Sequence, residues 1–464
     1  MARARVAAGV FGQLDQAQVD RIVEAVYRAG FDARVQLAQR AAEETGMGRW
    51  QHKVIKNVVA TQFVWEDIRH LPTVGVIAED EERGIVEIAQ PLGPILAVIP
   101  ATNPTSTTLF KVLSALKTRN PVIVSPARRA LQCTVETAQL CYAAALAAGA
   151  PDDCILWLEE VSREQTQALM AHPGLALILA TGASSLVHSA YSSGTPTLGV
   201  GPGNVPVFID RSTDLEFAAG EICTSKLFDN GTICASEQAL VLESELRQPL
   251  LEAFERRGAV LLNRGQARQL EAVLFDREGR VNPELVGRSA AVIAEQAGLQ
   301  LPPGTELLLV EPEGVGEEHP LSREILAPVL ALYAVEGYEA AINTCLDLNF
   351  FGGMGHTVSL FCNDEARIRD FAALMTAGRI VVNMPSSQGA VGRIYNALHP
   401  SFTLGCGTGG KNITTDNVTA RHLINVQRVA RRREDRALAN FNSAHYLDPS
   451  LDSRAIEALF HRNR

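Results

Sequence analysis

One cysteine in the middle of the chain has the surroundings that nucleophilic catalysis requires. Cys234 lies in the stretch 225–238, SKLFDNGTICASEQ, where Asn230 and Gly231 form a strong turn signal. A sharp bend just before the cysteine is expected to leave its sulfur at the mouth of a cleft. A thiolate is the most nucleophilic common side chain near neutral pH and suits attack on a carbonyl carbon. The alternative is a buried structural cysteine, because free cysteines are among the most buried residues.

Composition excludes several classes of function. The chain has 464 residues, 47% of them hydrophobic and 20% charged, with a net charge of -10. We expect a globular protein of two or three packed units that binds neither nucleic acid nor a membrane surface, since both are anionic. No apolar run approaches the roughly 20 residues that span a bilayer, and we expect no signal peptide. The eight cysteines are scattered without zinc-ligand spacing, which predicts a cytoplasmic protein without a metal.

Alternating strand and helix patterns predict the fold class. Apolar runs bounded by turns predict buried strands at 95–99, 121–124, 154–158 and 175–180, with helices at 107–117, 130–148 and 164–171 between them. This alternation predicts an α/β fold with a doubly wound, mostly parallel sheet. A second α/β unit begins near Gln238, and we place the domain boundary near Ser225. A helix that Asp15 caps and Gly30 ends, and another reaching Thr45, are interpreted as a packing layer without visible chemistry.

Small and polar residues follow two of these strands, at the sheet edge where open α/β folds bind their ligands. The segment PATNPTS follows the first strand at 100–106. The segment ATGASSLV at 180–187 opens a helix, whose free N–H groups suit a pyrophosphate, although an ordinary turn is the alternative. The three glycines within 199–203 indicate either close approach of the backbone to a ligand or a plain tight turn.

These segments together resemble the CoA-acylating aldehyde dehydrogenases, which include the aldehyde dehydrogenase half of bifunctional aldehyde-alcohol dehydrogenases and CoA-dependent succinate semialdehyde dehydrogenases. The resemblance covers roughly residues 91–433. Its most specific pieces are ATNPTS at 101–106, YSSG at 191–194, FDNGTICASEQ at 228–238, SSQG at 386–389 and LGCG at 404–407. It implies an aldehyde dehydrogenase-like fold, with two Rossmann-type doubly wound domains and a small β oligomerisation arm.

The resemblance also implies how the chain is divided. A cofactor-binding domain would take residues 1–224 and include an arm strand pair near 73–88. The catalytic domain with the nucleophilic cysteine would take residues 225–411. Residues 412–464 would form the oligomerisation arm, its return segment and the C-terminal tail.

By this resemblance three residues carry the chemistry. Cys234 is the nucleophile, and the side-chain amide of Asn103 joins the backbone N–H of Cys234 in holding the aldehyde oxygen. His356 assists proton transfer to or from the sulfur. The alternative for Asn103 is a helix cap before Pro104, and the alternative for His356 is a structural histidine at a strand start.

The resemblance assigns the cofactor to the turns of the first domain. Glu324 matches the glutamate that holds the nicotinamide ribose, with a surface glutamate as the alternative. The full cofactor-binding set is Thr102, Ser125, Pro126, Thr181, Gly182, Ala183, Ser184, Gly201 and Glu324. The segment SPARR at 125–129 lacks an acidic residue that would repel a 2′-phosphate, so we predict NAD without excluding NADP.

A missing carboxylate indicates the acyl acceptor. Hydrolytic aldehyde dehydrogenases carry a water-activating glutamate in a Glu-Leu-Gly-Gly segment, and the matching stretch here, at 199–202, reads GVGP. We therefore predict reversible, NAD-dependent oxidation of an aldehyde to an acyl-CoA through a thiohemiacetal and a thioacyl-enzyme on Cys234. The alternatives are a hydrolytic aldehyde dehydrogenase and a silent scaffold protein, and the intact Asn103 and Cys234 argue against the scaffold.

Substrate and partners are predicted less directly. The resemblance assigns Ser386, Ser387 and Arg393 to the substrate pocket. In acetaldehyde-using members an acidic residue stands at the position of Arg393, so the arginine favours an anionic aldehyde such as succinate semialdehyde or sulfoacetaldehyde. The alternatives are acetaldehyde or propionaldehyde, with Arg393 paired to a surface carboxylate. We expect a homodimer or homotetramer, and the amphipathic tail at 451–460 is either a docking peptide for a bacterial microcompartment or a helix packed on the oligomer.

Overall fold

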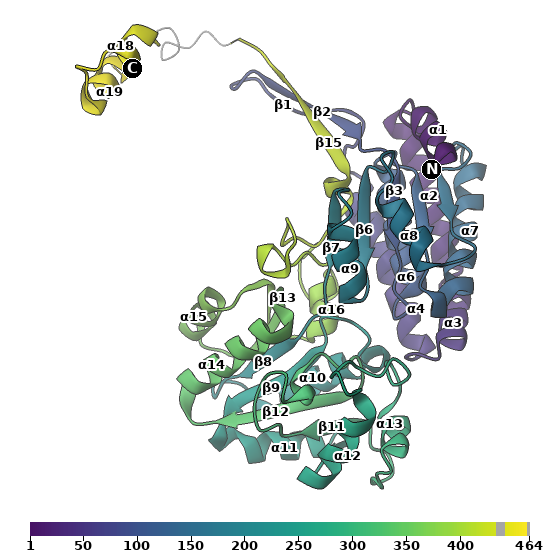
Figure 1. Cartoon of the computed structure of the whole chain (residues 1–464), viewed down its shortest axis with the longest axis vertical. Coiled ribbons are helices and arrows are strands. Elements are labelled where there is room, and N and C mark those ends of the chain that lie inside the picture. Colours follow the sequence, from purple (N-terminus) through teal and green to yellow (C-terminus); the bar gives the residue numbers. More distant parts are fainter. Residues whose placement is uncertain (433–440, 462–464) are drawn as a thin grey trace. The chain divides into compact units, whose positions relative to one another are not determined.

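The chain folds into two compact units, and the larger one carries both parallel sheets (Figure 1). The structure is a computed structural model that describes residues 1–432 and 441–461. The larger unit comprises Met1–Leu71 and Pro91–Leu423, and the smaller begins with Pro72–Gln90 and continues from Ile424. Every helix along the described residues is too short or too polar to cross a membrane.

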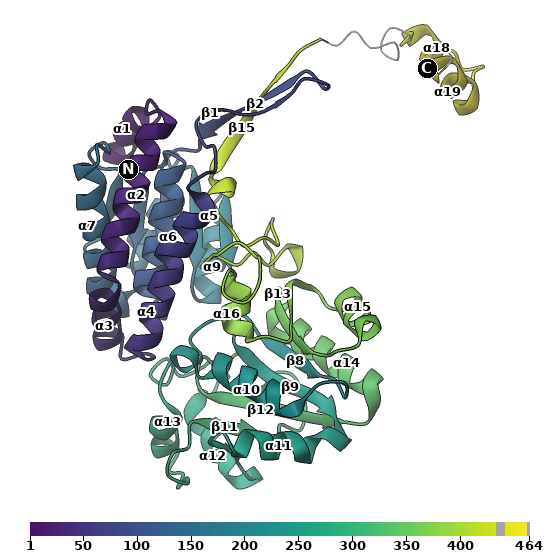
Figure 2. The same cartoon turned by 180° about the vertical axis from the view of Figure 1, so that it is seen from behind.

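A five-stranded parallel sheet, in the order β5-β4-β3-β6-β7, forms the first half of the larger unit. Its strands are β3 (Ile95–Val98), β4 (Val122–Ser125), β5 (Ile155–Trp157), β6 (Leu177–Thr181) and β7 (Thr197–Val200). Helices α8 (Arg163–Met170) and α9 (Ser184–Tyr191) cover one face in Figure 1, and α6 (Pro104–Lys117) and α7 (Leu131–Ala147) cover the other in Figure 2. Because both faces are covered, β3 and β4 are buried along their whole lengths.

A layer of N-terminal helices packs on α6 and α7 (Figure 2). The helices of this layer are α2 (Gln16–Asp32), α3 (Arg34–Thr45), α4 (Trp50–Val58) and α5 (Val64–Ile68), and α1 (Ala2–Phe11) precedes them in the chain. Asp15 caps α2 through a capping box with Gln18, as the sequence predicts for the start of this helix. The expected end at Gly30 is wrong, since the helix continues to Asp32. Gly30 serves close packing instead, because a Cβ there would lie 2.6 Å from Leu109 Cδ2.

The second half of the larger unit is a seven-stranded parallel sheet in the order β10-β11-β12-β9-β8-β13-β14. Its strands are β8 (Val205–Ile209), β9 (Glu237–Glu243), β10 (Ala259–Leu261), β11 (Leu307–Val310), β12 (Val329–Val335), β13 (Gly355–Phe361) and β14 (Ala377–Val382). Separate apolar cores fill its two faces. The helices that accompany the sheet are α10 (Leu215–Lys226), α11 (Arg247–Glu255), α12 (Arg264–Leu274), α13 (Ala290–Gln296), α14 (Gly337–Leu348), α15 (Glu365–Leu374) and α16 (Ser386–Val391). The predicted doubly wound, parallel α/β class is confirmed.

The chain passes from the first sheet to the second between β7 and β8. Strand β8 pairs with β9 and β13, although it precedes Ser225, where the sequence suggests a boundary. Four residues, 201–204, connect the two sheets, and they lie next to the cysteine segment described below. The division of the chain at 224 and 411 stays a prediction.

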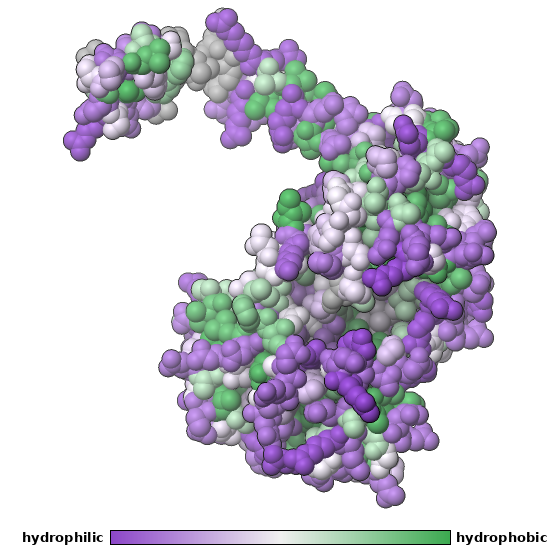
Figure 3. Space-filling model, in the orientation of Figure 1, coloured by the Kyte–Doolittle hydropathy of each residue, from purple (hydrophilic) through white to green (hydrophobic). Residues whose placement is uncertain are grey.

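The smaller unit contains a three-stranded sheet in the order β1-β2-β15. Strands β1 (Gly75–Asp80) and β2 (Ile85–Pro91) form an antiparallel pair, and β15 (Ile424–Ala430) adds to β2. Two short helices, α18 (Ser443–Leu447) and α19 (Ser453–His461), follow, and Figure 3 shows apolar and polar side chains mixed on their surface. The amphipathic tail is therefore helical from Ser453, while its docking or packing role stays a prediction.

Candidate active site

A cleft of about 770 Å³ lies where the two halves of the larger unit meet. Its walls include the carboxyl ends of β3, β4 and β6, which is the edge at which parallel α/β sheets bind ligands. The sequence-predicted residues that line it are Thr102, Asn103, Ser125, Pro126, Thr181, Gly182, Ala183, Gly201, Cys234 and Glu324. The structure thus brings both proposed cofactor contacts and the thiol to one cavity of the size that holds a small molecule.

The sulfur of Cys234 is presented by a tight turn ahead of β9. Asp229, Asn230 and Gly231 all have positive φ, between 53° and 74°, which reverses the chain just before the cysteine. A Cβ at Gly203 would overlap the carbonyl oxygen of Cys234, so this glycine permits the connection between the sheets to touch the thiol segment. The other seven cysteines are buried, whereas Cys234 is partly accessible.

His356, the second residue of β13, contacts the thiol directly. Its Nε2 lies 3.2 Å from Cys234 Sγ, and its Nδ1 lies 2.9 Å from Thr357 Oγ1. Arg379 on β14 holds the backbone of β13 in place by donating a hydrogen bond from Nη2 to His356 O over 2.8 Å. The imidazole is fully buried near the start of β13, so the catalytic role of His356 and the alternative of a structural histidine both stay predictions.

Burial decides where the proton of this pair resides. Burial raises the pKa of Cys234 to about 12, and the negative charge of Glu324 acts in the same direction. Burial and the positive charge of Arg379 lower the pKa of His356 to about 3. The resting pair is therefore a thiol beside a neutral imidazole, in contrast to a thiolate–imidazolium ion pair. A neutral imidazole can accept the thiol proton as the sulfur attacks.

Asn103 stands between β3 and Pro104, the first residue of α6. Its side chain makes no capping bond to the helix, so the alternative role as a helix cap is not observed. The amide oxygen accepts a hydrogen bond of 2.6 Å from Lys56 Nζ. The amide nitrogen donates to Thr102 Oγ1 over 3.1 Å and, over a long 3.4 Å, to the carbonyl oxygen of Thr232, two residues before the nucleophile. The amide N–H groups consequently face the cysteine segment.

Glu324 and the turn after β6 are the features that could hold a dinucleotide. Glu324 Oε1 accepts a 3.0 Å hydrogen bond from the backbone N–H of Gly203, which fixes the carboxyl group at the cleft wall. Burial raises the pKa of Glu324 to about 8, so the group is largely protonated at neutral pH and presents a hydroxyl to a ligand. A Cβ at Gly201 would meet nothing within 4 Å, so the backbone there is open to the cleft. Ser184 begins α9 directly after this turn.

The predicted substrate-pocket residues do not line this cleft. Ser386 and Ser387 are fully buried at the start of α16, where the Ser387 backbone N–H and side chain bond to Ser225 of α10. Arg393 is exposed, with φ of 74°, and no ion pair to it forms among the residues that the structure describes. The assignment of all three residues to a substrate pocket stays a prediction.

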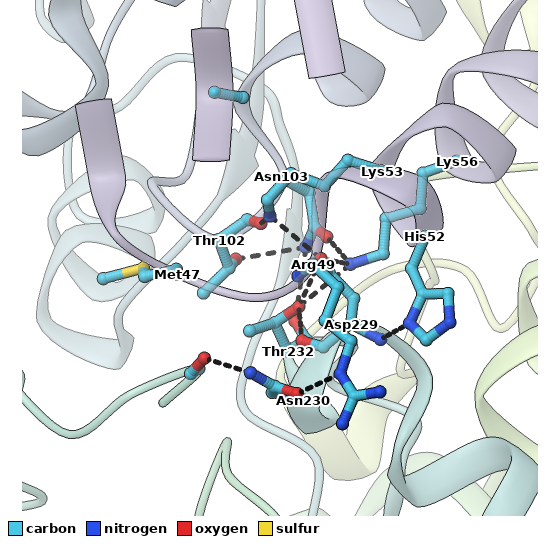
Figure 4. A network of polar contacts seen from close by, with 12 residues as sticks. Met47, Arg49, His52, Lys53, Lys56, Thr102, Asn103, Asp229, Asn230 and Thr232 are labelled. Atoms are coloured by element: carbon cyan, nitrogen blue, oxygen red, sulfur yellow. Dashed lines mark hydrogen bonds and ion pairs between the residues drawn. The ribbon is translucent and has the colours of Figure 1, made fainter. Parts of the chain in front are cut away.

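A buried ionic cluster beside Asn103 was missed by sequence reasoning (Figure 4). It consists of Lys53 and Lys56 from α4, both 2% exposed, and Asp229 from the turn before Cys234. The lysines are three residues apart on a helix, a spacing that also describes an ordinary solvated face. Asp229 has a positive φ, which cannot be read from the residue type.

Comparison with known proteins identifies the class to which this fold and site belong. The profile of the aldehyde dehydrogenase family matches residues 1–272. The chain belongs to the aldehyde dehydrogenase family. Within it, the crystal structure of an acetylating aldehyde dehydrogenase from Geobacillus thermoglucosidasius is 42% identical with a TM-score of 0.91, covering 94% of this chain and 96% of that one. The resemblance to acylating aldehyde dehydrogenases is thereby confirmed, as is the aldehyde dehydrogenase-like fold.

The curated relatives differ in length and in the aldehyde they are named for. An aldehyde-alcohol dehydrogenase of Clostridium acetobutylicum is 43% identical over 92% of this chain but only 49% of its own length, so the chain spans about half of that relative. A sulfoacetaldehyde dehydrogenase (acylating) of Cupriavidus necator is 38% identical, covering 93% and 88% of the two chains. A succinate-semialdehyde dehydrogenase (acetylating) of Clostridium kluyveri is 35% identical, covering 92% and 94%.

A solved relative carries the chemistry expected of this class. The crystal structure of Rhodopseudomonas palustris propionaldehyde dehydrogenase with bound CoA and an acylated cysteine is 26% identical with a TM-score of 0.83. It covers 93% of this chain and 95% of that chain. That relative therefore holds CoA together with an acyl group on a cysteine.

Proposed function

We propose that this chain oxidises an aldehyde to an acyl-CoA, reversibly and with NAD, through a thioester on Cys234. The observation that carries the proposal is the 3.2 Å contact between the buried His356 Nε2 and Cys234 Sγ, in a cysteine that lines the same cleft as Asn103. Nucleophile, base and oxyanion donor are the three groups that acyl transfer through sulfur requires.

The chain's own residues carry out the proton and charge movements. In the tautomer that donates from Nδ1 to Thr357 Oγ1, His356 Nε2 accepts the thiol proton while Cys234 Sγ bonds to the aldehyde carbon. The amide N–H of Asn103 and the backbone N–H of Cys234 then hold the oxyanion, and each such donor contributes about 3 to 4 kcal/mol. When the oxyanion collapses, the carbon loses a hydride and the thioester remains on Cys234. His356 releases the first proton to solvent and then accepts the proton of the CoA thiol. The CoA sulfur bonds to the carbonyl carbon, the bond to Cys234 Sγ breaks, and His356 returns the proton to that sulfur.

NAD bound in the cleft would accept the hydride. The residues present fit such a group, because the protonated Glu324 can donate to a ribose hydroxyl and the open backbone at Gly201 allows close approach. The turn at Thr181 and Gly182 would hold the pyrophosphate with the first N–H groups of α9. Ser125 and Pro126 would flank the adenosine, and the absence of an acidic side chain between 125 and 129 leaves NADP as a second option.

Transfer to CoA in preference to water follows from the carboxylates at the cleft. Among the described residues that line it, Glu324 is the one carboxyl group, and it is largely protonated at neutral pH and bonded to Gly203 N. It is therefore a poor base for water. Gly199 occupies the position of the hydrolytic glutamate. A Cβ at Gly199 would lie 2.9 Å from Tyr191 Oη, so Tyr191 fills the space that a larger side chain would need.

The proposed substrate is a short aldehyde that carries a second, anionic group. Two relatives are named for such aldehydes, succinate semialdehyde and sulfoacetaldehyde. Arg393 is the residue proposed to favour them, since its guanidinium is exposed and unpaired among the described residues. A charge-assisted hydrogen bond of about 1.5 to 3 kcal/mol corresponds to a preference of roughly ten- to a hundredfold over a neutral aldehyde.

One assay tests the reaction class, and a substrate panel tests the anionic preference. Formation of NADH is followed with NAD and an aldehyde, in the presence and in the absence of CoA. We expect turnover that depends on CoA, whereas a rate that is the same without CoA, with free acid as product, indicates the hydrolytic alternative. For the panel, kcat/KM is compared for succinate semialdehyde, sulfoacetaldehyde and propionaldehyde in the wild type and in Arg393→Ala. A wild-type preference for propionaldehyde, or an equal loss on all three aldehydes, contradicts the role of Arg393.

A further inference from the structure

Two buried lysines share one carboxylate next to the proposed oxyanion donor. Lys53 and Lys56 both approach Asp229 Oδ2, over 2.9 Å and 2.5 Å, and all three side chains are at least 97% buried. Asp229 Oδ1 is occupied separately by the backbone N–H of Arg49 at 2.8 Å. Two ammonium groups facing one carboxylate leave an excess of positive charge in a desolvated place, which is costly unless that charge has a further use.

The two lysines differ in what else they contact (Figure 4). Lys53 Nζ donates to a backbone oxygen, Thr102 O, over 3.1 Å. Lys56 Nζ donates to the side-chain oxygen of Asn103 over 2.6 Å and to Thr232 Oγ1 over 2.9 Å. Of the two, only Lys56 therefore bonds a side chain that the proposed mechanism uses.

The contact with Lys56 determines which end of the Asn103 amide faces the nucleophile. An ammonium group donates hydrogen bonds and accepts none, so the amide oxygen must turn toward Lys56 and the NH₂ group away from it. The NH₂ group then faces Thr232 O, in the segment that ends at Cys234. A cation on the amide oxygen also polarises the amide and makes its N–H groups stronger donors.

We propose that Lys56 is a positioning residue for the oxyanion site, acting through the side-chain oxygen of Asn103. Lys56 orients the amide and strengthens its N–H donors, and it touches neither substrate nor thiol in this role. The inference rests on the proposed function, which gives Asn103 the oxyanion. Lys53 provides the matched control, because it lies on the same helix, has the same burial and shares the same carboxylate.

The test compares Lys56→Met with Lys53→Met, alone and combined with Asn103→Ala, in the CoA-dependent NADH assay. Each lysine variant removes one ammonium group from Asp229, so we expect similar falls in the thermal unfolding midpoint. We expect Lys56→Met to lower kcat by about ten- to a hundredfold with KM changed by less than about threefold, while Lys53→Met changes kcat by less than about threefold. In the Asn103→Ala background, Lys56→Met should have almost no further effect on kcat, since its target is gone. Lys56→Gln, a smaller change, is measured alongside and should lower kcat in the same direction.

The outcomes separate this inference from the proposed function. If Asn103→Ala keeps wild-type turnover, the proposed oxyanion role of Asn103 fails. If Asn103→Ala is impaired but Lys56→Met acts additively with it, or no more strongly than Lys53→Met, Lys56 has no role through the amide. A third measurement is the rate of Cys234 alkylation by iodoacetamide against pH, which Lys56→Met should leave unchanged. A shifted profile would mean that Lys56 acts on the thiol, and would overturn the inference.

Discussion

The ionisation state of Cys234 gives the sharpest test of the site. The structure places the sulfur beside a neutral imidazole and raises the pKa of Cys234 to about 12 through burial and the nearby Glu324. At pH 7 only about one thiol in a hundred thousand would be ionised, against roughly 3% for a thiol of ordinary pKa. A thiolate of higher pKa is intrinsically more nucleophilic, and this raises its alkylation rate by about 1.5 powers of ten, which partly offsets the smaller thiolate fraction. Alkylation at pH 7 should therefore be about a hundredfold slower than for a free thiol.

The assay is the rate of iodoacetamide incorporation at Cys234, followed by mass spectrometry without NAD or aldehyde between pH 6 and pH 10. We expect the rate to keep rising up to pH 10 without a plateau, because the thiolate fraction increases with pH everywhere below the pKa of Cys234. Cys234→Ala supplies the background, which should be low since the other seven cysteines are buried. A rate that levels off below pH 8 would refute the reasoning, because it would reveal a thiolate already stabilised as an ion pair with His356.

Three further outcomes follow from the same site. His356→Ala should retain the rising alkylation profile but lose about 10² to 10⁴ in CoA-dependent kcat, since only the proton acceptor is removed; unchanged kcat would mean that another group takes the proton. Glu324→Gln should flatten the pH dependence of stability. The folded pKa of about 8 lies above the unfolded value, so the stability that protonation confers is complete below about pH 4.5 and lost as pH rises through 8. The thermal unfolding midpoints of the wild type and of Glu324→Gln at pH 5 and pH 9 check this. An equal change of the midpoint between the two pH values in both proteins contradicts it. Gly199→Glu should destabilise the protein by about 1 to 3 kcal/mol, because its Cβ would lie 2.9 Å from Tyr191 Oη; urea unfolding measures the loss, and a stable variant that releases free acid would show that the side chain reaches the cleft after all.

Buried parallel strands were the most predictable part of the fold. The predicted runs at 95–99 and 121–124 match β3 and β4 to within one residue at each end, since strands covered on both faces are continuous apolar segments between turns. Strands β10 and β14 were not predicted, because each is an edge strand with partly exposed residues and lacks such a run. Helix α6 begins at Pro104, earlier than the predicted 107, since proline suits the first helical position.

The sequence could suggest site residues only where a side chain of suitable chemistry lies within a recognisable motif. Cys234 and Asn103 follow from motifs, but the contact between Cys234 and His356 joins residues 122 apart in the chain, which no spacing rule reveals. Lys56 was missed because nothing in its own segment marks it. Its helix carries no motif, and the carboxylate and amide that define its surroundings lie on other segments of the chain.

The arrangement of the cluster explains how a site built from two halves can keep its geometry. Asn103 lies between β3 of the first sheet and α6, and Cys234 lies just before β9 of the second sheet, so the distance between them depends on the contacts that join these segments. Asp229 provides this connection. It lies five residues before Cys234 and forms ion pairs with both lysines of α4, and Lys56 in turn bonds Asn103. A glycine at 48, whose Cβ would overlap Asp229 Oδ1, lets the start of α4 approach closely enough. A buried ion pair is a poor source of net stability, but removing one partner typically costs about 3 to 5 kcal/mol, so it strongly disfavours any other register. We therefore infer that the excess charge is tolerated because it keeps Asn103, the proposed oxyanion donor, at a fixed distance from Cys234, the proposed nucleophile.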